Sequence, residues 1–255
     1  MRISQLAKEI EDLGGTITSV AQCFVCGNVD CHISFTMPQS GESKESDKES
    51  SAVNAENALE KQPTFLDVRD WCDKGIADRK VKIGDKFILP ALKVPSANCD
   101  GVSFDEIDLK DVAVIAVHVE ARRVVFNFED VLFCHSVDPK CSGSPFESTP
   151  LGVYLAIPFA KALEESAGKV KVSLLSESNV FNEDDDDFMP YFKPIKNRIK
   201  VLASENDTHW WWLKTPRASN SSNFCFVRHN GYSGIGNASA EGGVAPAFEF
   251  TAESV

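Results

Sequence analysis

The chain has 255 residues, of which 43% are hydrophobic, enough to bury the core of one large domain or of one domain with a small appendage. Its 38 acidic residues outnumber its 26 Lys and Arg residues, and the net charge of −12 argues against general binding to nucleic acid, because phosphate backbones are also negative. No apolar run reaches the roughly 20 residues that span a bilayer, so we expect no membrane-spanning segment.

The first segment, residues 1–38, is predicted to be a small helix followed by a cysteine-containing stretch. Apolar residues recur at helical spacing ahead of two glycines, at Ile3, Leu6, Ala7, Ile10 and Leu13. Residues 16–35 indicate short β segments. The start of the chain mixes charged and apolar residues, so we expect no secretory signal and, for the eight cysteines, free thiols in a reducing compartment.

The cysteines of this segment are spaced like one half of a zinc site. Cys23 and Cys26 are separated by two residues and Cys31 follows, but no second pair with matching spacing is present. Cys72 could complete a site in three dimensions. The alternative is that these cysteines are small buried apolar side chains, and we favour that alternative and assign no metal. Cys134 and Cys141 form the pair that oxidation could join.

Residues 39–62 are predicted to be a disordered linker. They are rich in Ser, Glu and Lys and contain almost no large apolar residue. Such a composition cannot bury enough apolar surface to offset the entropy of ordering. We therefore place a domain boundary here, with the main domain at residues 63–252.

The main domain is predicted to begin with an amphipathic helix at residues 65–77. The turn at Gly84 and Asp85 indicates a hairpin, and a second hairpin is expected from residues 112–119 and 124–128. A helix at residues 151–165 contains Pro158, which should kink or break it. Early helices with strands and a long irregular section late in the chain favour the α+β class.

Metal or enzyme chemistry finds little support in the remaining sequence. The acidic run at residues 183–187 could hold calcium, but it lacks the glycine of a calcium loop, and a run of like charges is more often a solvated turn. His118 is best explained as a strand residue. We can name no nucleophile with a paired base, and we therefore expect no enzyme, no catalytic residues and no cofactor.

The most informative feature is a rigid aromatic run together with the polar segment after it. Trp210, Trp211 and Trp212 alternate along a predicted strand, so at least one side of that strand should be core. The polar segment, from Arg217 to Gly242, is full of Ser, Asn, Gly, Tyr, Phe and Arg. These residue types build adaptable binding surfaces. The pattern predicts recognition on a rigid frame.

Several short motifs taken together resemble a known family. They include Leu151-Gly152-Val153-Tyr154-Leu155, Tyr191-Phe192-Lys193, Trp211-Trp212-Leu213-Lys214-Thr215-Pro216 and Gly243-Val244-Ala245-Pro246-Ala247-Phe248. Over residues 64–250 the chain resembles the uncharacterised C-type-lectin-like domain common in Firmicutes and their prophages. The family usually reads WWLRSP and GVRPA, whereas this chain has Lys214, Thr215 and Ala245 in place of Arg, Ser and Arg. The resemblance implies an α+β C-type-lectin-like domain, here with a small N-terminal appendage.

The resemblance also implies a mechanism of diversification. The family includes variable target proteins of diversity-generating retroelements, in which adenine-directed mutagenesis rewrites the segment between the last two motifs. Codons that keep a fixed final C cannot encode Lys, Glu, Gln, Met or Trp. Residues 215–240 contain none of these five types. The composition therefore agrees with a diversified segment.

We therefore predict a receptor or surface-recognition protein, encoded by a phage or prophage and used for host attachment. The partner would be a protein or glycan on a cell surface, and the chain would be found in the virion or, before assembly, in the bacterial cytoplasm. The N-terminal region could dock on a virion partner, and a homo-oligomer is possible. The alternatives are a structural virion or assembly component and, less favoured, an enzyme of the formylglycine-generating type. The predicted ligand-binding residues are Arg217, Ser219, Asn220, Ser222, Asn223, Phe224, Arg228, His229, Asn230, Tyr232 and Asn237.

Overall fold

A computed structural model describes residues 16–25, 28–36 and 63–252, and the chain divides into two units, Met1–Leu59 and Glu60–Val255. In the first unit, β1 (Thr16–Val25) and β2 (Asn28–Thr36) form an antiparallel pair. The predicted helix at the start of the chain, the linker at residues 39–62 and Cys26 lie outside the described residues. The side chains of Cys23 and Cys31 also lie outside them, so the zinc alternative stays a prediction.

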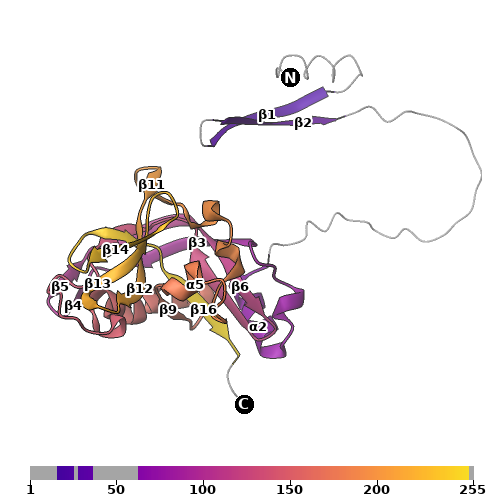
Figure 1. Cartoon of the computed structure of the whole chain (residues 1–255). Coiled ribbons are helices and arrows are strands. Elements are labelled where there is room, and N and C mark those ends of the chain that lie inside the picture. Colours follow the sequence, from indigo (N-terminus) through magenta and orange to yellow (C-terminus); the bar gives the residue numbers. More distant parts are fainter. Residues whose placement is uncertain (1–15, 26–27, 37–62, 253–255) are drawn as a thin grey trace, which may run out of the picture. The chain divides into compact units, whose positions relative to one another are not determined.

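The described part of the second unit is built mainly from two five-stranded sheets (Figure 1). The first sheet is antiparallel throughout, in the order β3 (Lys86–Val94), β6 (Ile107–Glu120), β7 (Arg123–Phe128), β16 (Ala247–Thr251) and β9 (Lys171–Ser173). The second has the order β14 (Ser233–Asn237), β13 (Asn220–Val227), β12 (Trp211–Arg217), β15 (Gly242–Val244) and β8 (Phe133–His135). Only its β12–β15 pair is parallel among these described strands.

Two small antiparallel pairs complete the described strands. They are β4 (Ala97–Cys99) with β5 (Val102–Phe104), and β10 (Lys200–Leu202) with β11 (Asp207–His209). Figure 1 shows β4 and β5 at one end of the second unit and α2 at the other.

The helices are short and begin and end at clear local signals. In α2 (Phe65–Lys74), the Thr64 side chain accepts a hydrogen bond from the backbone N–H of Asp67, and the Asp67 side chain accepts one from the backbone N–H of Thr64. Gly75 ends this helix in the left-handed conformation. A longer helical stretch combines α3 (Pro150–Tyr154), the π-helical turn η3 (Leu155–Phe159) and α4 (Ala160–Ala167). The remaining segments are α5 (Glu177–Phe181) and the 3-10 turns η1 (Ala77–Arg79), η2 (Phe146–Ser148), η4 (Pro190–Phe192) and η5 (Ile195–Arg198).

The central strands β7 and β12 are buried on both faces over part of their length, because alternate residues enter two different core clusters. In β7, Val124 and Phe126 belong to the cluster that also contains residues of α2, α3 and α4, whereas Val125 belongs to the cluster that contains residues of α5 and η4. In β12, Trp212 joins the first cluster and Trp211 the second. The two clusters therefore pack against opposite faces of these strands.

The predicted α+β class is wrong, because strands dominate the described residues and the helices are short. In the late section of the chain, strands are predicted at the tryptophan run, at residues 224–228 and at residues 244–250, and they are confirmed as parts of β12, β13, β15 and β16. The strand β14 lies in a stretch that reads as irregular from its Gly, Asn and Ser content. The expected hairpin at Gly84 is also wrong, since β3 pairs with β6 instead. The pairing of β6 with β7 confirms the second hairpin, and Pro158 lies in the π-helical turn that interrupts the predicted helix.

Candidate ligand-recognition surface

The strands β12 to β15 carry or border the predicted binding residues, and we name these strands the frame. Two tryptophans of β12 anchor this frame. Trp211 and Trp212 are fully buried on opposite faces of the strand. Each indole N–H is satisfied, because Trp211 Nε1 donates to the Arg198 carbonyl at 2.9 Å and Trp212 Nε1 donates to the His135 carbonyl at 3.1 Å. The predicted alternation of the aromatic run is therefore confirmed for these two residues.

Glycines on the neighbouring strands make room for this aromatic cluster. A Cβ atom on Gly234 of β14 would lie 2.5 Å from the Phe226 ring, and one on Gly242 of β15 would lie 2.2 Å from the Trp210 ring. The rings of Trp210 and Phe226 are themselves in contact, with centroids 4.8 Å apart. The backbone of the glycine-rich segment is thus fixed by close packing.

The predicted binding residues fall into two groups at opposite ends of β13. The pairing of β13 with β14 begins at Asn223 and Asn237, midway along β13, and ends at Val227 and Ser233. Asn223 and Arg228 are five positions apart, which is about 17 Å along an extended strand. The structure therefore does not gather the predicted residues into one surface.

The first group, which we name the serine–asparagine surface, lies at the turn between β12 and β13 and at the end of β14. Its members are Arg217, Ser219, Asn220, Ser222, Asn223 and Asn237. It contacts residues 138–144, which were not predicted to belong to a site. Ser222 Oγ donates to the Cys141 carbonyl at 2.9 Å, and Cys141 Sγ donates to Asn237 Oδ1 at 2.8 Å.

Asp138 holds the backbone of this neighbouring loop. Its carboxylate accepts from the backbone N–H and the hydroxyl of Ser142, each at 2.6 Å. Burial alone would raise the pKa of Asp138, but these hydrogen bonds, together with the Lys140 backbone N–H and charge, lower it below its usual value. The loop is therefore held by a carboxylate that is ionised at neutral pH.

The second group, which we name the tyrosine-loop surface, consists of Arg228, His229, Asn230 and Tyr232 together with Ile195 and Ile199. Gly231 has a φ of +83° and lies so close to η5 that a Cβ atom would be 2.8 Å from Ile195 Cγ2 and 3.4 Å from Ile199 Cγ1. Tyr232 is 57% exposed, Ile195 41% and Ile199 38%. The loop thus sets an aromatic residue beside two exposed aliphatic side chains.

The two isoleucines could not be identified from the sequence, because apolar residues in that stretch read as core. Residues 138–144 carry the Asp, Pro, Ser and Gly typical of a loop, but no sequence signal connects them with β13.

Phe224 is a correction to the predicted site. It is 1% exposed, belongs to the first core cluster and contacts the Phe146 ring with centroids 6.3 Å apart. Alternation along β13 directs it to the same face as Phe226. Its side chain is part of the core and does not contribute a contact surface.

The structure brings together one thiol and one imidazole that the sequence does not connect. Cys134 Sγ lies 3.7 Å from His209 Nε2, and His209 Nδ1 lies 2.7 Å from the Trp210 carbonyl. A nucleophilic cysteine needs a lowered pKa. Here burial, followed by the charges of Glu205 and Glu241, raises the pKa of Cys134. The pair has the spacing of a nucleophile and a base without the electrostatics that would activate the thiol.

Within residues 63–252, no group of three or more His, Cys, Asp or Glu side chains is arranged to hold a metal ion. In the acidic run, Asp185 accepts hydrogen bonds from Asn182 and from the Asp187 backbone, and Glu183 pairs with Lys193 at 3.3 Å. Cys72, considered as a fourth zinc ligand, is buried and donates to the Phe250 carbonyl. Cys134 and Cys141 are free thiols, and His118 is a strand residue that contacts Glu120.

Comparison with known proteins gives one partial match. A family model described as a domain of unknown function, DUF6273, matches residues 159–251. That range includes the frame and every binding residue predicted from the sequence. No curated protein and no solved structure matches the chain. In the described residues, no helix is long and apolar enough to cross a membrane.

Proposed function

We propose that this chain is a ligand-binding protein that recognises a protein on a cell surface through the tyrosine-loop surface. The observation that carries the proposal is the joint exposure of Tyr232, Ile195 and Ile199 beside Arg228, on a backbone fixed by the close approach of Gly231 to η5. Tyr and Arg are enriched where protein interfaces bind most strongly, and an apolar centre with a polar rim is typical of such interfaces.

Charge specifies the kind of partner. Arg228 Nε donates to the Ser233 carbonyl at 3.0 Å, and its guanidinium lies 5.8 Å from the Phe226 ring centroid. Among the described residues, neither Arg228 nor Lys196 has a carboxylate within 4.0 Å. Arg228 in the tyrosine-loop surface and Lys196, which follows Ile195 in η5, are thus exposed and unpaired in a chain of net charge −12, and they favour a partner with an acidic rim.

The retroelement hypothesis belongs to this proposal and stands on the sequence. Diversification requires exposed side chains on a backbone that does not depend on them. All four loop members, Arg228, His229, Asn230 and Tyr232, are exposed. We propose that they are the varied positions, in a phage or prophage protein used for attachment. The proposal does not depend on a lectin fold.

Binding to bacterial cells tests the protein partner. The labelled chain is incubated with a panel of bacterial strains, before and after the cells are treated with protease or with periodate. We expect binding to at least one strain, sensitive to protease and resistant to periodate. The variant Arg228→Ser, His229→Ser, Asn230→Ser, Tyr232→Ser should lose this binding.

The matched control changes the other surface. Ser219→Ala, Asn220→Ser and Asn223→Ser together remove polar side chains from the serine–asparagine surface and leave the tyrosine loop intact. This control should bind like the wild type. Loss of binding in the control alone would mean that recognition takes place at the serine–asparagine surface, and sensitivity to periodate alone would mean that the ligand is a glycan. No binding to any strain would favour a structural component.

The genome tests diversification separately. We expect a reverse transcriptase gene and a near-repeat of the DNA that encodes residues 217–239, differing at adenines. Deep sequencing of a culture should show variation at the codons for exposed residues of this segment and none at the codon for Phe224. Absence of both the near-repeat and the variation would contradict the retroelement hypothesis and leave the binding proposal standing.

A further inference from the structure

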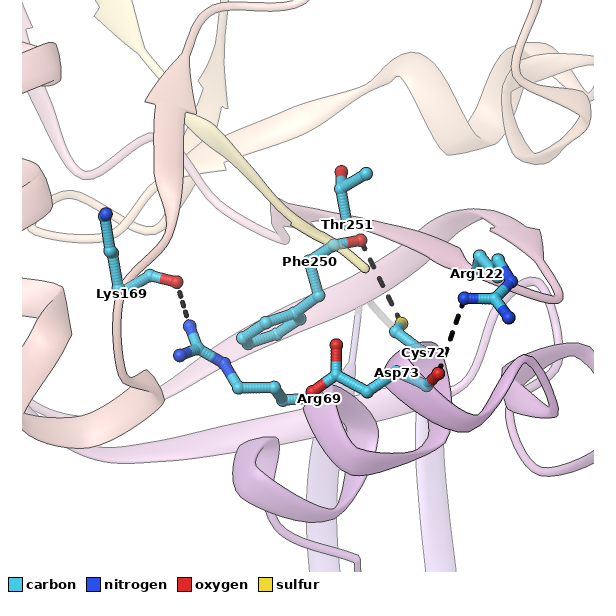
Figure 2. Close-up of a pocket in the computed structure, with 7 residues that line it drawn as sticks. All are labelled: Arg69, Cys72, Asp73, Arg122, Lys169, Phe250 and Thr251. Carbon is cyan, nitrogen blue, oxygen red and sulfur yellow. Dashed lines mark hydrogen bonds between the residues drawn. The ribbon is translucent and has the colours of Figure 1, made fainter. Parts of the chain in front are cut away.

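A basic pocket lies between α2, the turn that joins β6 to β7, and β16, and none of its lining residues belongs to the serine–asparagine surface or to the tyrosine-loop surface. It has a volume of about 480 Å³, within the range of small-molecule sites. We name it the basic pocket. Its lining residues are Arg69, Cys72, Asp73, Arg122, Lys169, Phe250 and Thr251. Figure 2 shows Arg69 and Lys169 on one side, Arg122 on the other, and Phe250 and Thr251 between them.

The charge of the pocket is opposite to that of the protein. Three cations, Arg69, Arg122 and Lys169, line it against one carboxylate, that of Asp73, whereas the whole chain has a net charge of −12. In the described part of the chain, none of the three cations has a carboxylate within 4.0 Å. Like charges that share a pocket repel one another, so a bound anion would relieve an unfavourable interaction.

The backbone holds the Arg69 guanidinium in place and contacts that of Arg122 more loosely. Arg69 donates to the Lys169 carbonyl and lies 5.6 Å from the Phe250 ring centroid. Arg122 Nη1 donates to the Asp73 carbonyl at 3.5 Å. Each uses one N–H group in this way, and a guanidinium has five. The remaining N–H groups are therefore available to a ligand in a preset orientation.

Two glycines pack against these same groups. Gly168 has a φ of +72°, and a Cβ atom there would lie 3.3 Å from Arg69 Cζ. Gly75 has a φ of +67°, and its Cβ atom would lie 3.4 Å from Arg122 Nε. The left-handed conformation favours glycine at both positions. Each arginine therefore packs closely against the backbone of a glycine.

The rest of the pocket favours a ligand larger than a bare anion. Asp73 supplies a hydrogen-bond acceptor and Thr251 a hydroxyl, and both are exposed, whereas Phe250 is buried and forms part of the wall. Lys169 and Thr251 also line an adjoining hollow of about 360 Å³ with Val170, Lys171 and Glu249. Cys72 forms the wall and is not a reactive group, since burial and then the charge of Asp73 raise its pKa to about 11.

We infer that the basic pocket binds a phosphate monoester, with the phosphate between Arg122, Arg69 and Lys169 and the hydroxyl-bearing body of the ester against Asp73 and Thr251. Arginine is suited to phosphate because its planar fork can make two parallel hydrogen bonds to it. The three cations and the one carboxylate of the pocket leave two positive charges, which match a doubly charged phosphate better than a ligand with one carboxylate. This inference does not depend on the proposed recognition surface.

Calorimetric titration at fixed ionic strength tests the inference. The probes are phenyl phosphate, glycerol phosphate and inorganic phosphate, added to the full chain up to about 10 mM, where binding of millimolar affinity is near saturation. We expect saturable binding of at least one ester, tighter than that of inorganic phosphate. The double variant Arg122→Gln, Lys169→Gln should weaken it by at least about tenfold, because contacts to a charged group are lost.

The control is Lys110→Gln, which removes one exposed cation from the other end of β6. It should bind the ester like the wild type. Thermal unfolding of all variants shows whether each is folded, and the single variants Arg122→Gln and Lys169→Gln replace the double variant if it is not. The inference is overturned if neither ester binds saturably, if inorganic phosphate binds as tightly as both esters, or if the folded variants bind the ester as tightly as the wild type.

Discussion

Trp211 and Tyr232 are both large aromatic residues of the C-terminal region, but their surroundings are opposite. Trp211 is fully buried in the second core cluster, and its indole N–H donates to the Arg198 carbonyl. Tyr232 is 57% exposed, and its hydroxyl has no hydrogen-bond partner among the described residues. Residue type alone therefore does not separate frame from surface, whereas position on a strand between two cores does.

The loop is held mainly by its backbone, although Arg228 Nε and Asn230 Oδ1 also form hydrogen bonds with backbone groups. The Gly231 N–H donates to the Arg228 carbonyl at 2.8 Å, and the Arg228 N–H donates to the Tyr232 carbonyl at the same distance. Asn230 Oδ1 accepts from the Tyr232 N–H at 3.4 Å. The frame, by contrast, is held by its side chains. Substitutions in the two regions test this difference.

The largest effect is expected at Trp211. Trp211→Ala removes a fully buried side chain, leaves a cavity and frees the Arg198 carbonyl from its partner. We expect a loss of about 3–5 kcal/mol in the free energy of unfolding. Chemical denaturation of the variant measures it. A loss below about 1 kcal/mol would mean that the frame does not carry the stability of this region.

A smaller effect is expected from added volume at Gly242. A Cβ atom at this position would lie 2.2 Å from the Trp210 ring and 2.6 Å from Trp212 Nε1, so both indoles would have to shift. Overpacking of this kind typically costs about 1–3 kcal/mol. Gly84→Ala is a useful comparison, because a Cβ atom there has no neighbour within 4 Å, although its φ of +95° adds strain. Thermal unfolding should show a greater loss for Gly242→Ala, and equal losses would contradict tight packing of the frame.

A pH-dependent effect is expected from a buried lysine beside the frame. Lys200 Nζ lies 5.2 Å from the Trp211 ring centroid and donates to the carbonyls of Phe128 and Glu129. Burial lowers the pKa of Lys200 to about 7, although the charges of Asp130 and Glu129 raise it. Between about pH 7 and 10, the unfolded chain binds a proton that the folded chain has released.

The free energy of unfolding should therefore include a term that rises with pH across this range. Lys200→Met removes the titrating group, so its stability should rise less with pH than that of the wild type. Denaturation at several pH values between about 7 and 9 compares the two slopes. Equal slopes would mean that Lys200 keeps the ordinary pKa of a lysine in the folded protein.

The smallest effect is expected at Tyr232. Tyr232→Ser removes an exposed side chain from a loop whose conformation is set by Gly231, so the free energy of unfolding should change by no more than about 0.5 kcal/mol. The same change should weaken binding to cells. A loss of stability as large as that of Trp211→Ala would make Tyr232 part of the core.

The sequence predicts those features of this architecture that depend on residues close together in the chain. Alternation of Trp211 and Trp212 and the pairing of β6 with β7 follow from periodicity, because both depend on residues close in the chain. Phe224 shows where such reasoning stops. Its side chain contacts Phe146, nearly eighty positions earlier, and no local pattern specifies that contact.

The two surfaces show the same limit. Composition identified Arg228, Asn230 and Tyr232 as adaptable residues, and the structure shows them exposed. It did not show that β13 separates them from Asn223 and Asn237, because the fold class was predicted incorrectly and the segment was not expected to form a five-stranded sheet. The basic pocket joins Arg69 with Lys169, a hundred positions apart, and only the tertiary structure brings them together.

The division between frame and surface can be measured directly with two displayed libraries. One randomises Arg228, His229, Asn230 and Tyr232, and the other randomises Trp211, Trp212, Phe224 and Val227. Resistance to protease reports the fraction of folded members in each library. We predict that most members of the loop library resist like the wild type and that few members of the frame library do. Equal losses of resistance in the two libraries would contradict this division.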